Sequence, residues 1–283
     1  MIDETVEEIR EMQTHSSSTV AVKAATALRE LLDREFASVE EYVRALERNS
    51  SALRRAQSSH ASLFTTQREI VARVSEAAPD SVESAKNVTA QAIDDVVESV
   101  ESAKTDAAAH AVELLPNGTT ILTHDYSSTV LEAIELATRE GNHIDVYVTE
   151  ARPRFLGRKT ARALAGNDRV DTTLIVDSAA GHYLDECDRV MVGMDCIVED
   201  TLYNRVGTFP IAATAAELAV PVTVVGASAK LIDEGFVFEN DHRTASEVMR
   251  EPAEGFTIEN PAYDATPTHL LENVVTDDGI EKP

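Results

Sequence analysis

The sequence predicts an α/β protein: an N-terminal helical domain, residues 1–112, followed by a Rossmann-like, doubly wound parallel sheet, residues 113–283. Three observations lead to this prediction. Residues 1–112 contain no glycine and a single proline, Pro79. Beyond them, short β-branched runs alternate with helix-compatible stretches, which is typical of right-handed crossovers between parallel strands. Polar side chains follow each run, where ligands bind in such sheets.

Composition sets the class of protein. The 283 residues suit two domains. The net charge of −25, from 50 acidic and 25 basic residues, argues against direct nucleic-acid binding and favours a halophilic source, where salt screens repulsion between carboxylates. No apolar run approaches the roughly 20 residues of a membrane helix, and the first residues are acidic. We therefore expect a cytoplasmic protein without a membrane partner.

Motifs for common cofactors and metals are absent from the sequence. The two cysteines, Cys187 and Cys196, have no Cys-x-x-Cys spacing and no clustered histidines, so no metal site is expected. Neither G-x-G-x-x-G nor a P-loop is present, which argues against dinucleotide and nucleoside-triphosphate binding. We expect no cofactor.

Apolar residues at helical spacing predict the helices of the N-terminal domain. The segment Thr14–Ser18 interrupts this pattern and can cap the second helix. Pro79-Asp80-Ser81 ends one helix and starts the last, whose Ala, Glu and Asp content predicts a solvated face. The apolar positions include Val6, Ile9, Val20, Ala24, Leu28, Leu31, Val39, Val43, Leu46, Leu63, Ile70, Val74, Val88, Ile93, Val96 and Val100.

Five β-branched runs in the C-terminal domain read as buried parallel strands. Helix-compatible stretches over residues 129–140, 159–165 and 211–218 lie between them. The runs are Thr120–Thr123, Ile144–Val148, Thr172–Val176, Arg189–Val192 and Val222–Val225.

Hydroxyl and cationic side chains collect just after these runs, where the carboxyl ends of parallel strands meet. Arginines and helix-start amides together suit an anion, so the sequence predicts a site for a small phosphorylated ligand. The candidate ligand-binding residues are Ser127, Ser128, Arg152, Arg158, Asn204, Arg205, Gly207, Thr208 and Lys230.

The same residues carry a resemblance to a known family. Asn204–Thr208 is similar to an Asn-Lys-Ile-Gly-Thr motif, and Asn260–Pro267 to an Asn-Pro-x-Phe-Asp-x-Thr-Pro motif. Further matches are Ile121–His124, Glu150–Pro153, Val176–Ala180 and Val192–Asp195. In this the chain resembles the translation initiation factor 2B alpha/beta/delta superfamily, which also contains ribose-1,5-bisphosphate isomerase and methylthioribose-1-phosphate isomerase. The resemblance covers most of residues 114–280.

The sequence departs from the isomerases of that superfamily at two places. The resemblance implies a catalytic Cys directly after Thr123-His124, paired with the Asp of a Gly-x-Asp motif; here the two positions are Asp125 and Asp195. An Asp with its ordinary pKa of about 4 is a poor proton donor, unless burial raises that value or the two carboxyls share a proton. Near the N-terminus, His15-Ser16-Ser17 stands where the bisphosphate isomerase has a phosphate-holding Arg-Gly-Ala.

Two interpretations follow. We favour a non-catalytic subunit similar to the initiation-factor chains, which binds a sugar phosphate or nucleotide and acts through assembly. The alternative is an aldose–ketose isomerase of a phosphorylated pentose, with Asp195 and Asp125 as its acid–base pair. A third possibility is a sugar-phosphate binder unrelated to translation. The resemblance also implies a homodimer or higher oligomer, for which Leu270, Leu271, Val274 and Val275 are a candidate contact or a core helix, and initiation factor 2 or related subunits as partners.

Overall fold

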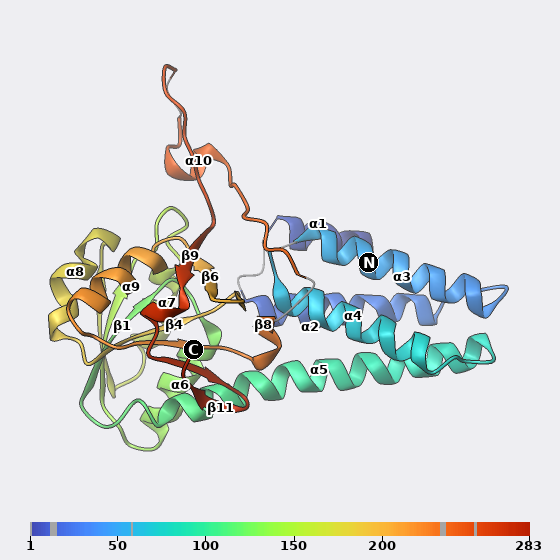
Figure 1. The fold of residues 1–283 in the computed structure, drawn as a ribbon, viewed down its shortest axis with the longest axis horizontal. Helices are drawn as coiled ribbons and strands as arrows, with labels where there is room; N and C mark the ends of the chain where they lie inside the picture. Colours follow the sequence, from blue (N-terminus) through green and yellow to red (C-terminus); the bar gives the residue numbers. More distant parts are fainter. Residues whose placement is uncertain (1, 12–15, 58, 233–235, 252–253) are drawn as a thin grey trace. The chain divides into compact units, whose positions relative to one another are not determined.

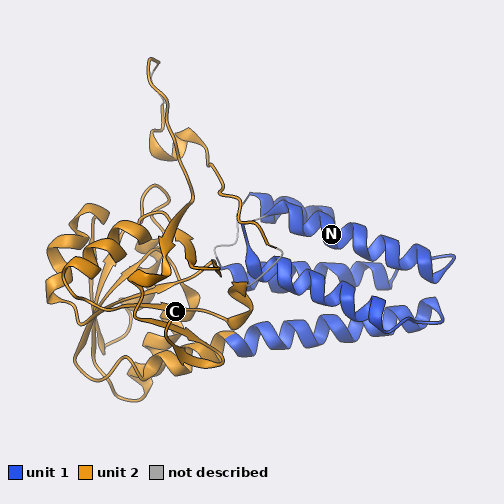
Figure 2. Cartoon of the chain, viewed as in Figure 1, with its two compact units in different colours: residues 1–103 blue, residues 104–283 orange. Residues whose placement is uncertain are grey.

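The computed structural model describes residues 2–11, 16–57, 59–232, 236–251 and 254–283. The chain divides into two compact units, residues 1–103 and 104–283 (Figure 2). The division falls within helix α5 (Val82–Val112), a few residues before the end of the predicted helical domain at residue 112. The architecture is α/β, with a helical N-terminal region and a mostly parallel C-terminal sheet, so the predicted fold class is confirmed.

Unit 1 is helical, as its apolar spacing predicts (Figure 1). Its helices are α1 (Ile2–Arg10), α2 (Ser17–Ala27), a 3-10 turn (Leu28–Leu32), α3 (Val39–Ala56), α4 (Ala61–Glu76) and the first part of α5. Ser16 caps α2 by accepting from the Thr19 amide at 3.5 Å; Thr14 and His15 lie outside the described residues. The core includes Tyr42, Leu46, Leu53, Leu63, Ile70 and Ile93, all fully buried.

Unit 2 is built on a seven-stranded sheet in the order β11-β10-β7-β4-β1-β2-β3. All neighbouring pairs are parallel except β10 with β11. The strands are β1 (Thr119–His124), β2 (Ile144–Thr149), β3 (Val170–Ile175), β4 (Arg189–Gly193), β7 (Val222–Val225), β10 (Asn273–Thr276) and β11 (Gly279–Glu281). The first five match the predicted runs to within a few residues.

Two apolar layers cover the two faces of this sheet. Ile121, Val146 and Met191 pack with α6 (Ser128–Arg139), α7 (Gly157–Leu164) and the end of α5. Leu122 and Val192, pointing the other way, pack with α8 (Ala180–Tyr183) and α9 (Thr208–Glu217). The side-chain period of two along a strand produces this division. The sheet is thus covered on both sides, as doubly wound folds require.

A second sheet of four strands was not predicted. Its order is β8-β5-β6-β9, with β5 (Cys196–Val198), β6 (Thr201–Arg205), β8 (Leu231–Ile232) and β9 (Tyr263–Pro267). Between β8 and β9 the chain projects outward and carries the short helix α10 (Ala245–Val248) (Figure 1). The pairing of β6 with β9 sets Arg205 opposite Tyr263, which fixes the residue at the centre of the site.

The apolar C-terminal stretch belongs to the core of unit 2, and not as a helix. Val274 and Val275 lie in strand β10 and are buried, as is Leu271. Leu270 packs partly buried against the same core. Leu271, Val274 and Val275 are therefore occupied within the unit and are not available as an oligomer contact, whereas Leu270, at the end of the 3-10 turn Thr268–Leu270, is only partly buried.

Candidate functional site

Strands β1 and β4 lie side by side at the point where the order of the sheet reverses. From β1 the chain builds outward to β2 and β3 on one side, and then returns to β4, β7 and β10 on the other. A crevice opens outside the carboxyl ends of the strands at such a switch point. Asp125 directly follows β1, and Asp195 is the second residue after the end of β4. Both candidate acids therefore stand at the place where this fold binds ligands.

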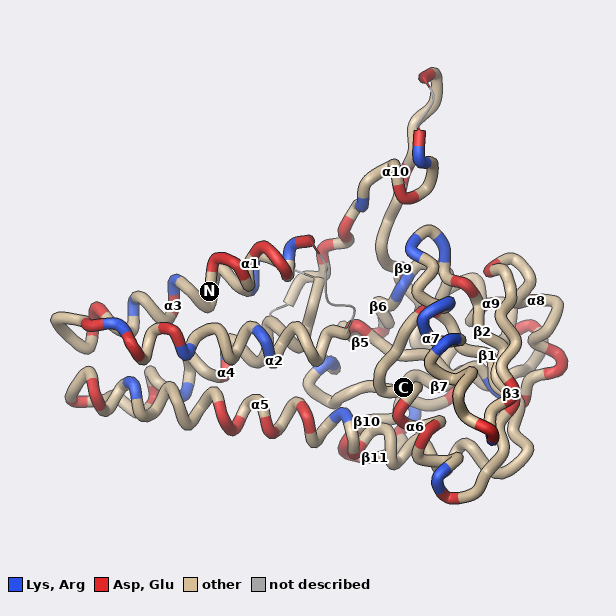
Figure 3. The backbone as a smooth tube through the Cα atoms, turned by 180° about the vertical axis from the view of Figure 1, so that it is seen from behind, with Lys and Arg blue, Asp and Glu red and all other residues tan. Residues whose placement is uncertain are grey.

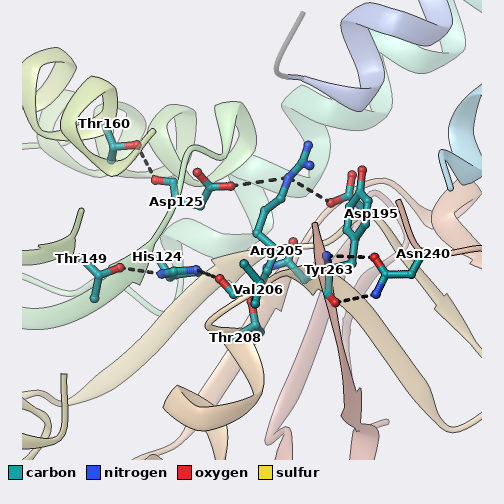
Figure 4. Close-up of polar contacts among 11 residues, drawn as sticks. His124, Asp125, Thr149, Thr160, Asp195, Arg205, Val206, Thr208, Asn240 and Tyr263 are labelled. Carbon is teal, nitrogen blue, oxygen red and sulfur yellow. Dashed lines mark hydrogen bonds and ion pairs between the residues drawn. The ribbon is translucent and has the colours of Figure 1, made fainter. Parts of the chain in front are cut away.

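Arg205 joins the two acids. Its Nε lies 3.5 Å from Asp125 Oδ2 and 3.6 Å from Asp195 Oδ2 (Figure 4). Its guanidinium also lies over the Tyr263 ring, 4.7 Å from the ring centre. We call Asp125, Asp195 and Arg205 the switch-point triad. All three side chains are nearly inaccessible to solvent, so a single buried cation faces two buried carboxyls and can balance the charge of only one of them.

Burial decides the protonation chemistry of the triad. Desolvation raises the pKa of Asp125, against the opposing influence of Arg205 and His124, while Asp195 raises it further. Desolvation opposes the charge on Arg205, but Tyr263, Asp195 and Asp125 together raise its pKa above the ordinary value. Arg205 is thus a permanent cation, and Asp125 is a carboxyl poised to hold a proton.

The backbone around Asp125 is fixed in an uncommon conformation. Asp125 has φ of +64°, which costs a non-glycine residue free energy and persists only where surroundings enforce it. The Thr160 hydroxyl donates to the Asp125 carbonyl oxygen at 2.7 Å. His124 Nδ1 is hydrogen-bonded to the Thr149 hydroxyl (2.6 Å), and Nε2 donates to the Val206 carbonyl oxygen (2.9 Å). These contacts hold β1 against the loop after β6.

Gly207 makes this approach feasible. A Cβ at this position would lie 2.6 Å from His124 Cε1, and its φ is +111°. Neither the space nor the backbone conformation suits another residue. The motif glycine therefore serves the close packing of His124 under the site.

A cleft beside the triad is lined by four arginines, Arg152, Arg154, Arg205 and Arg243, together with Asp125 and Asn260. We call it the arginine cleft. Burial lowers the pKa of Arg154, and the charges of Arg243 and Arg205 lower it further. Cations are therefore crowded here, although Asp and Glu are spread along the whole chain (Figure 3) and the net charge is −25. Such a cluster is suited to an anion with several oxygens, such as a phosphate.

Carboxylates hold the walls of the cleft in place. Asp177, just after β3, accepts the amides of Ala151 and Arg152, each at 2.7 Å. Glu247 accepts from Arg243 Nε at 2.9 Å and from Nη2 at 2.6 Å through its two oxygens. The pKa of Glu247 is lowered by this bond with Arg243. The arginines are thus positioned from the loop after β2 and from the projecting segment.

The predicted ligand residues separate into two groups. Arg152 and Arg205 line the arginine cleft. Arg158 does not: its Nη2 donates to Glu150 at 2.7 Å, and it stacks on Phe155. Lys230 is buried, its pKa is lowered by desolvation, and its Nζ donates to the Met194 carbonyl oxygen at 2.8 Å.

The predicted hydroxyl and amide donors cap helices. Ser127 Oγ accepts the Val130 amide at 3.3 Å at the start of α6, where Ser128 is the first helical residue. The amides of Gly207 and Phe209 both donate to Asp264 Oδ2, at 2.7 and 3.0 Å. The chain's own carboxylate thus occupies the N-terminus of α9, where an anionic ligand was expected. Asn204 donates to Thr208 Oγ1 at 3.0 Å, and Thr208 donates to the Arg205 carbonyl oxygen at 2.7 Å.

Three residues of the cleft were missed by sequence reasoning. Arg154 belongs to the segment after β2 that contains Arg152 and Arg158, but nothing in that segment distinguishes which arginines turn inward. Asn260 opens the motif Asn260–Pro267, which gave a signal that was not used. Arg243 lies in a segment without periodicity, and its backbone amide donates to the Asn260 carbonyl oxygen at 2.8 Å. No pattern in the sequence points to Arg243.

One group of side chains in the described ranges has the composition of a metal site. His143, Asp145 and Asp171 bring ligand atoms within 4.8 Å of one another, at the opposite, amino ends of β2 and β3. Exposed acidic clusters of this kind are common without a metal. Among the described residues, no helix is long and apolar enough to cross a membrane.

A buried acid pair lies beside an arginine cleft at the switch point of a doubly wound sheet. Residues 13–283 match the Initiation factor 2 subunit family, and the chain belongs to that family. It is 32% identical to the ribose 1,5-bisphosphate isomerase of Haloterrigena turkmenica over 99% of this chain and 89% of that protein. It is 31% identical to that of Haloferax volcanii over 99% and 88%.

Two solved structures share the fold. The translation initiation factor eIF-2B of Pyrococcus horikoshii OT3 matches with a TM-score of 0.85 and 24% identity, covering 100% of this chain and 97% of that one. The 5-methylthioribose 1-phosphate isomerase of the same organism matches with a TM-score of 0.83 and 23% identity, covering 100% and 84%. Both share the fold, and the family match together with the isomerase relatives confirms the superfamily resemblance.

The favoured interpretation as a non-catalytic initiation-factor subunit is wrong. Its structural relatives are below 25% identity, where the likeness concerns the fold alone. The nearly full-length relatives at about 30% identity, from several archaea, are all named ribose 1,5-bisphosphate isomerase. The absence of a thiol after His124 says nothing about the burial of Asp125, which raises the pKa of its carboxyl.

Proposed function

We propose that this protein is an aldose–ketose isomerase of a phosphorylated pentose. The observation that carries the proposal is the switch-point triad, in which a proton-holding carboxyl and a second carboxyl flank one buried arginine. The names of the relatives support it: ribose 1,5-bisphosphate and methylthioribose-1-phosphate are both riboses with a phosphate on C1. We favour the bisphosphate, because relatives of that name are matched over almost the whole chain.

The acid–base roles follow from the environment of each carboxyl. Asp125, with its raised pKa, donates a proton to the ring oxygen as the bond from C1 to that oxygen breaks. Asp195 accepts the proton of the C2 hydroxyl while the hydrogen on C2 moves with its electron pair to C1. C1 is reduced, C2 is oxidised to the ketone, and one proton enters as one leaves. The catalyst is reset when that proton returns from Asp195 to Asp125.

This route removes the electrostatic objection to a second carboxyl in the site. An enediolate intermediate would gain negative charge beside Asp125 and Asp195, which would oppose its formation. A hydride shift forms no enediolate, because the electron deficiency develops at C1. Arg205 meanwhile offsets the negative charge of the pair. An acid with a raised pKa can therefore stand where the related isomerases have a thiol.

The arginine cleft is proposed to hold phosphate. Arg152, Arg154 and Arg243 offer guanidinium groups around the same space, and guanidinium groups match phosphate oxygens in pairs. Arg205 is engaged with the acids, so it orders the reacting end of the sugar more than it binds phosphate. Ser127, Ser128, Asn204, Gly207, Thr208, Arg158 and Lys230 stay predictions as direct ligands; their observed contacts favour a supporting role.

Turnover of ribose 1,5-bisphosphate by the purified full chain tests the proposal. In concentrated potassium chloride, the ketone carbon of the product is followed by ¹³C NMR. The wild type should form ketose, and Asp195→Asn should not. Asp185→Asn, an exposed acid in unit 2, is the control and should keep full activity. Methylthioribose-1-phosphate is tested in the same way. If a folded protein that binds both compounds forms ketose from neither, this would falsify the isomerase.

Several wider properties are proposed on the same basis. We infer that residues 1–112 and 113–283 act as domains of a cytoplasmic protein that assembles as a homodimer or larger; a relative of this fold has been solved as a tetrameric complex. Association with initiation factor 2 or related subunits stays a prediction. The acidic composition still predicts a protein from a halophile.

A further inference from the structure

A groove between α3 and α4 lies within unit 1, whereas the switch-point triad belongs to unit 2. It is lined by Glu47, Ser50, Ser51, Arg54, Gln67 and Arg68. Its volume is about 460 Å³, within the range of roughly 300–1,000 Å³ typical of small-molecule sites. Nothing in the proposed isomerase chemistry uses these side chains.

Gln67 lines this groove and is fully buried. Within the described part of the chain, neither its amide nitrogen nor its amide oxygen has a hydrogen-bond partner, and the same is true of Arg54 Nε. Its neighbour Ser50 donates to the Gln67 backbone carbonyl instead, at 3.2 Å. A buried polar group without a partner is destabilising. Among the described residues, the Gln67 amide lacks both an acceptor for its nitrogen and a donor for its oxygen.

Two arginine side chains of this groove lie close to each other. The guanidinium carbons of Arg54 and Arg68 lie 5.5 and 5.2 Å from the centre of the same Phe64 ring. Burial lowers the pKa of Arg54, and the charges of Arg68 and Arg55 lower it further. Two neighbouring cations that repel each other in a chain of net charge −25 indicate a site for an anion.

We propose that the α3–α4 groove binds a small oxyanion that also carries hydroxyl groups, such as a hydroxylated phosphate monoester. Arg68 and Arg54 Nε hold the phosphate oxygens. The Gln67 amide nitrogen donates to the ligand, and its amide oxygen accepts a ligand hydroxyl. Glu47, which also lines the groove, accepts another ligand hydroxyl. Because its carboxylate repels anions, an anion without a hydroxyl group is disfavoured. The proposal is independent of the isomerase activity.

Calorimetry on the full chain tests it, with ribose 5-phosphate, inorganic phosphate and ribose as separate probes. The protein carries Arg154→Ala throughout, which weakens phosphate binding at the arginine cleft. Ribose 5-phosphate should still bind at one site per chain, more tightly than inorganic phosphate, and ribose should not bind. Adding Arg68→Ala should weaken this binding at least about tenfold, the size of a lost charged hydrogen bond. Arg48→Ala, an exposed arginine of α3, should leave it unchanged.

Gln67→Leu separates a ligand site from a packing defect. Removing an unpaired amide should raise the midpoint of thermal unfolding by a few degrees and should also abolish the ribose 5-phosphate binding. A higher midpoint with unaltered binding overturns the proposal, as does binding that is insensitive to Arg68→Ala. A change of oligomeric state with Arg68→Ala, without any ligand binding, would instead assign the groove to an acidic segment of a second copy.

Discussion

The switch-point triad and the α3–α4 groove bury polar side chains in opposite ways. In the triad, Arg205 lies within 3.6 Å of a carboxylate oxygen of Asp125 and of Asp195, so the chain compensates its own charges. In the groove, Gln67 has no partner for either amide atom among the described residues. Compensated charges remain in place without a ligand, as acid–base chemistry requires; uncompensated groups are left for a ligand to satisfy.

The largest effect should come from Asp125→Asn. The amide keeps the shape of the carboxyl but cannot donate the proton that the ring oxygen needs. Turnover should fall by about 10²–10⁴-fold, the usual contribution of a general acid. Steady-state kinetics with ribose 1,5-bisphosphate measure this, and KM should change little, because the phosphate is held by the arginine cleft. Turnover equal to that of the wild type would remove Asp125 from the chemistry.

Arg205→Met should expose how strongly the triad depends on internal compensation. The substitution keeps much of the side-chain volume and leaves two buried carboxyls without their shared cation. Breaking a buried ion pair from one side costs about 3–5 kcal/mol, and we expect the lower value, because a protonated Asp125 loses no ionic partner. Urea unfolding measures the loss. Gln67→Leu should instead increase stability. If both substitutions lower the free energy of unfolding equally, the two sites do not differ in how their buried polar groups are compensated.

The pH dependence of stability follows from the raised pKa of Asp125. An ordinary Asp titrates near pH 4, so above that pH the unfolded chain loses a proton that the folded protein still holds. The free energy of unfolding therefore falls as pH rises from about 4 to the raised pKa of Asp125 in the folded protein. Below pH 4 the contribution of Asp125 to stability is fully present. Turnover falls in the same direction, because the acid must be protonated. Thermal unfolding against pH should show a smaller decline for Asp125→Asn than for the wild type.

The two regions also differ in how far the sequence could predict them. Strands β1, β2 and β4 are short runs rich in β-branched residues, so their burial, and the position of Asp125 and Asp195 after them, could be predicted. The second sheet could not, because β6 has only five residues and pairs with β9, about sixty residues further along. Arg243 reaches the cleft from an irregular segment through one backbone bond to Asn260. Long-range pairing of short segments leaves no local pattern.

The pKa of Asp125 was equally out of reach of the sequence. A carboxyl after Thr123-His124 gives no sign of how deeply it is buried, and burial is the main cause of its raised pKa. The same sequence therefore suggested a defective isomerase, although the structure provides a carboxyl able to hold a proton. Residue type alone led to the wrong choice between a non-catalytic subunit and an isomerase, because that choice depends on the surroundings of Asp125.

The smallest expected effect concerns Asp264, which caps α9 beneath the site. Its Oδ2 accepts the amides of Gly207 and Phe209, so Asp264→Ala leaves both without that acceptor and removes a negative charge from a helix N-terminus. The loss should be about 1–2 kcal/mol, seen as a thermal midpoint lower by several degrees. Asp264→Asn, which keeps an accepting oxygen, should recover most of it. If phosphate occupied this helix N-terminus instead, Asp264→Ala would tighten the binding of ribose 1,5-bisphosphate; because the carboxylate is a structural cap, we expect binding to stay the same or weaken.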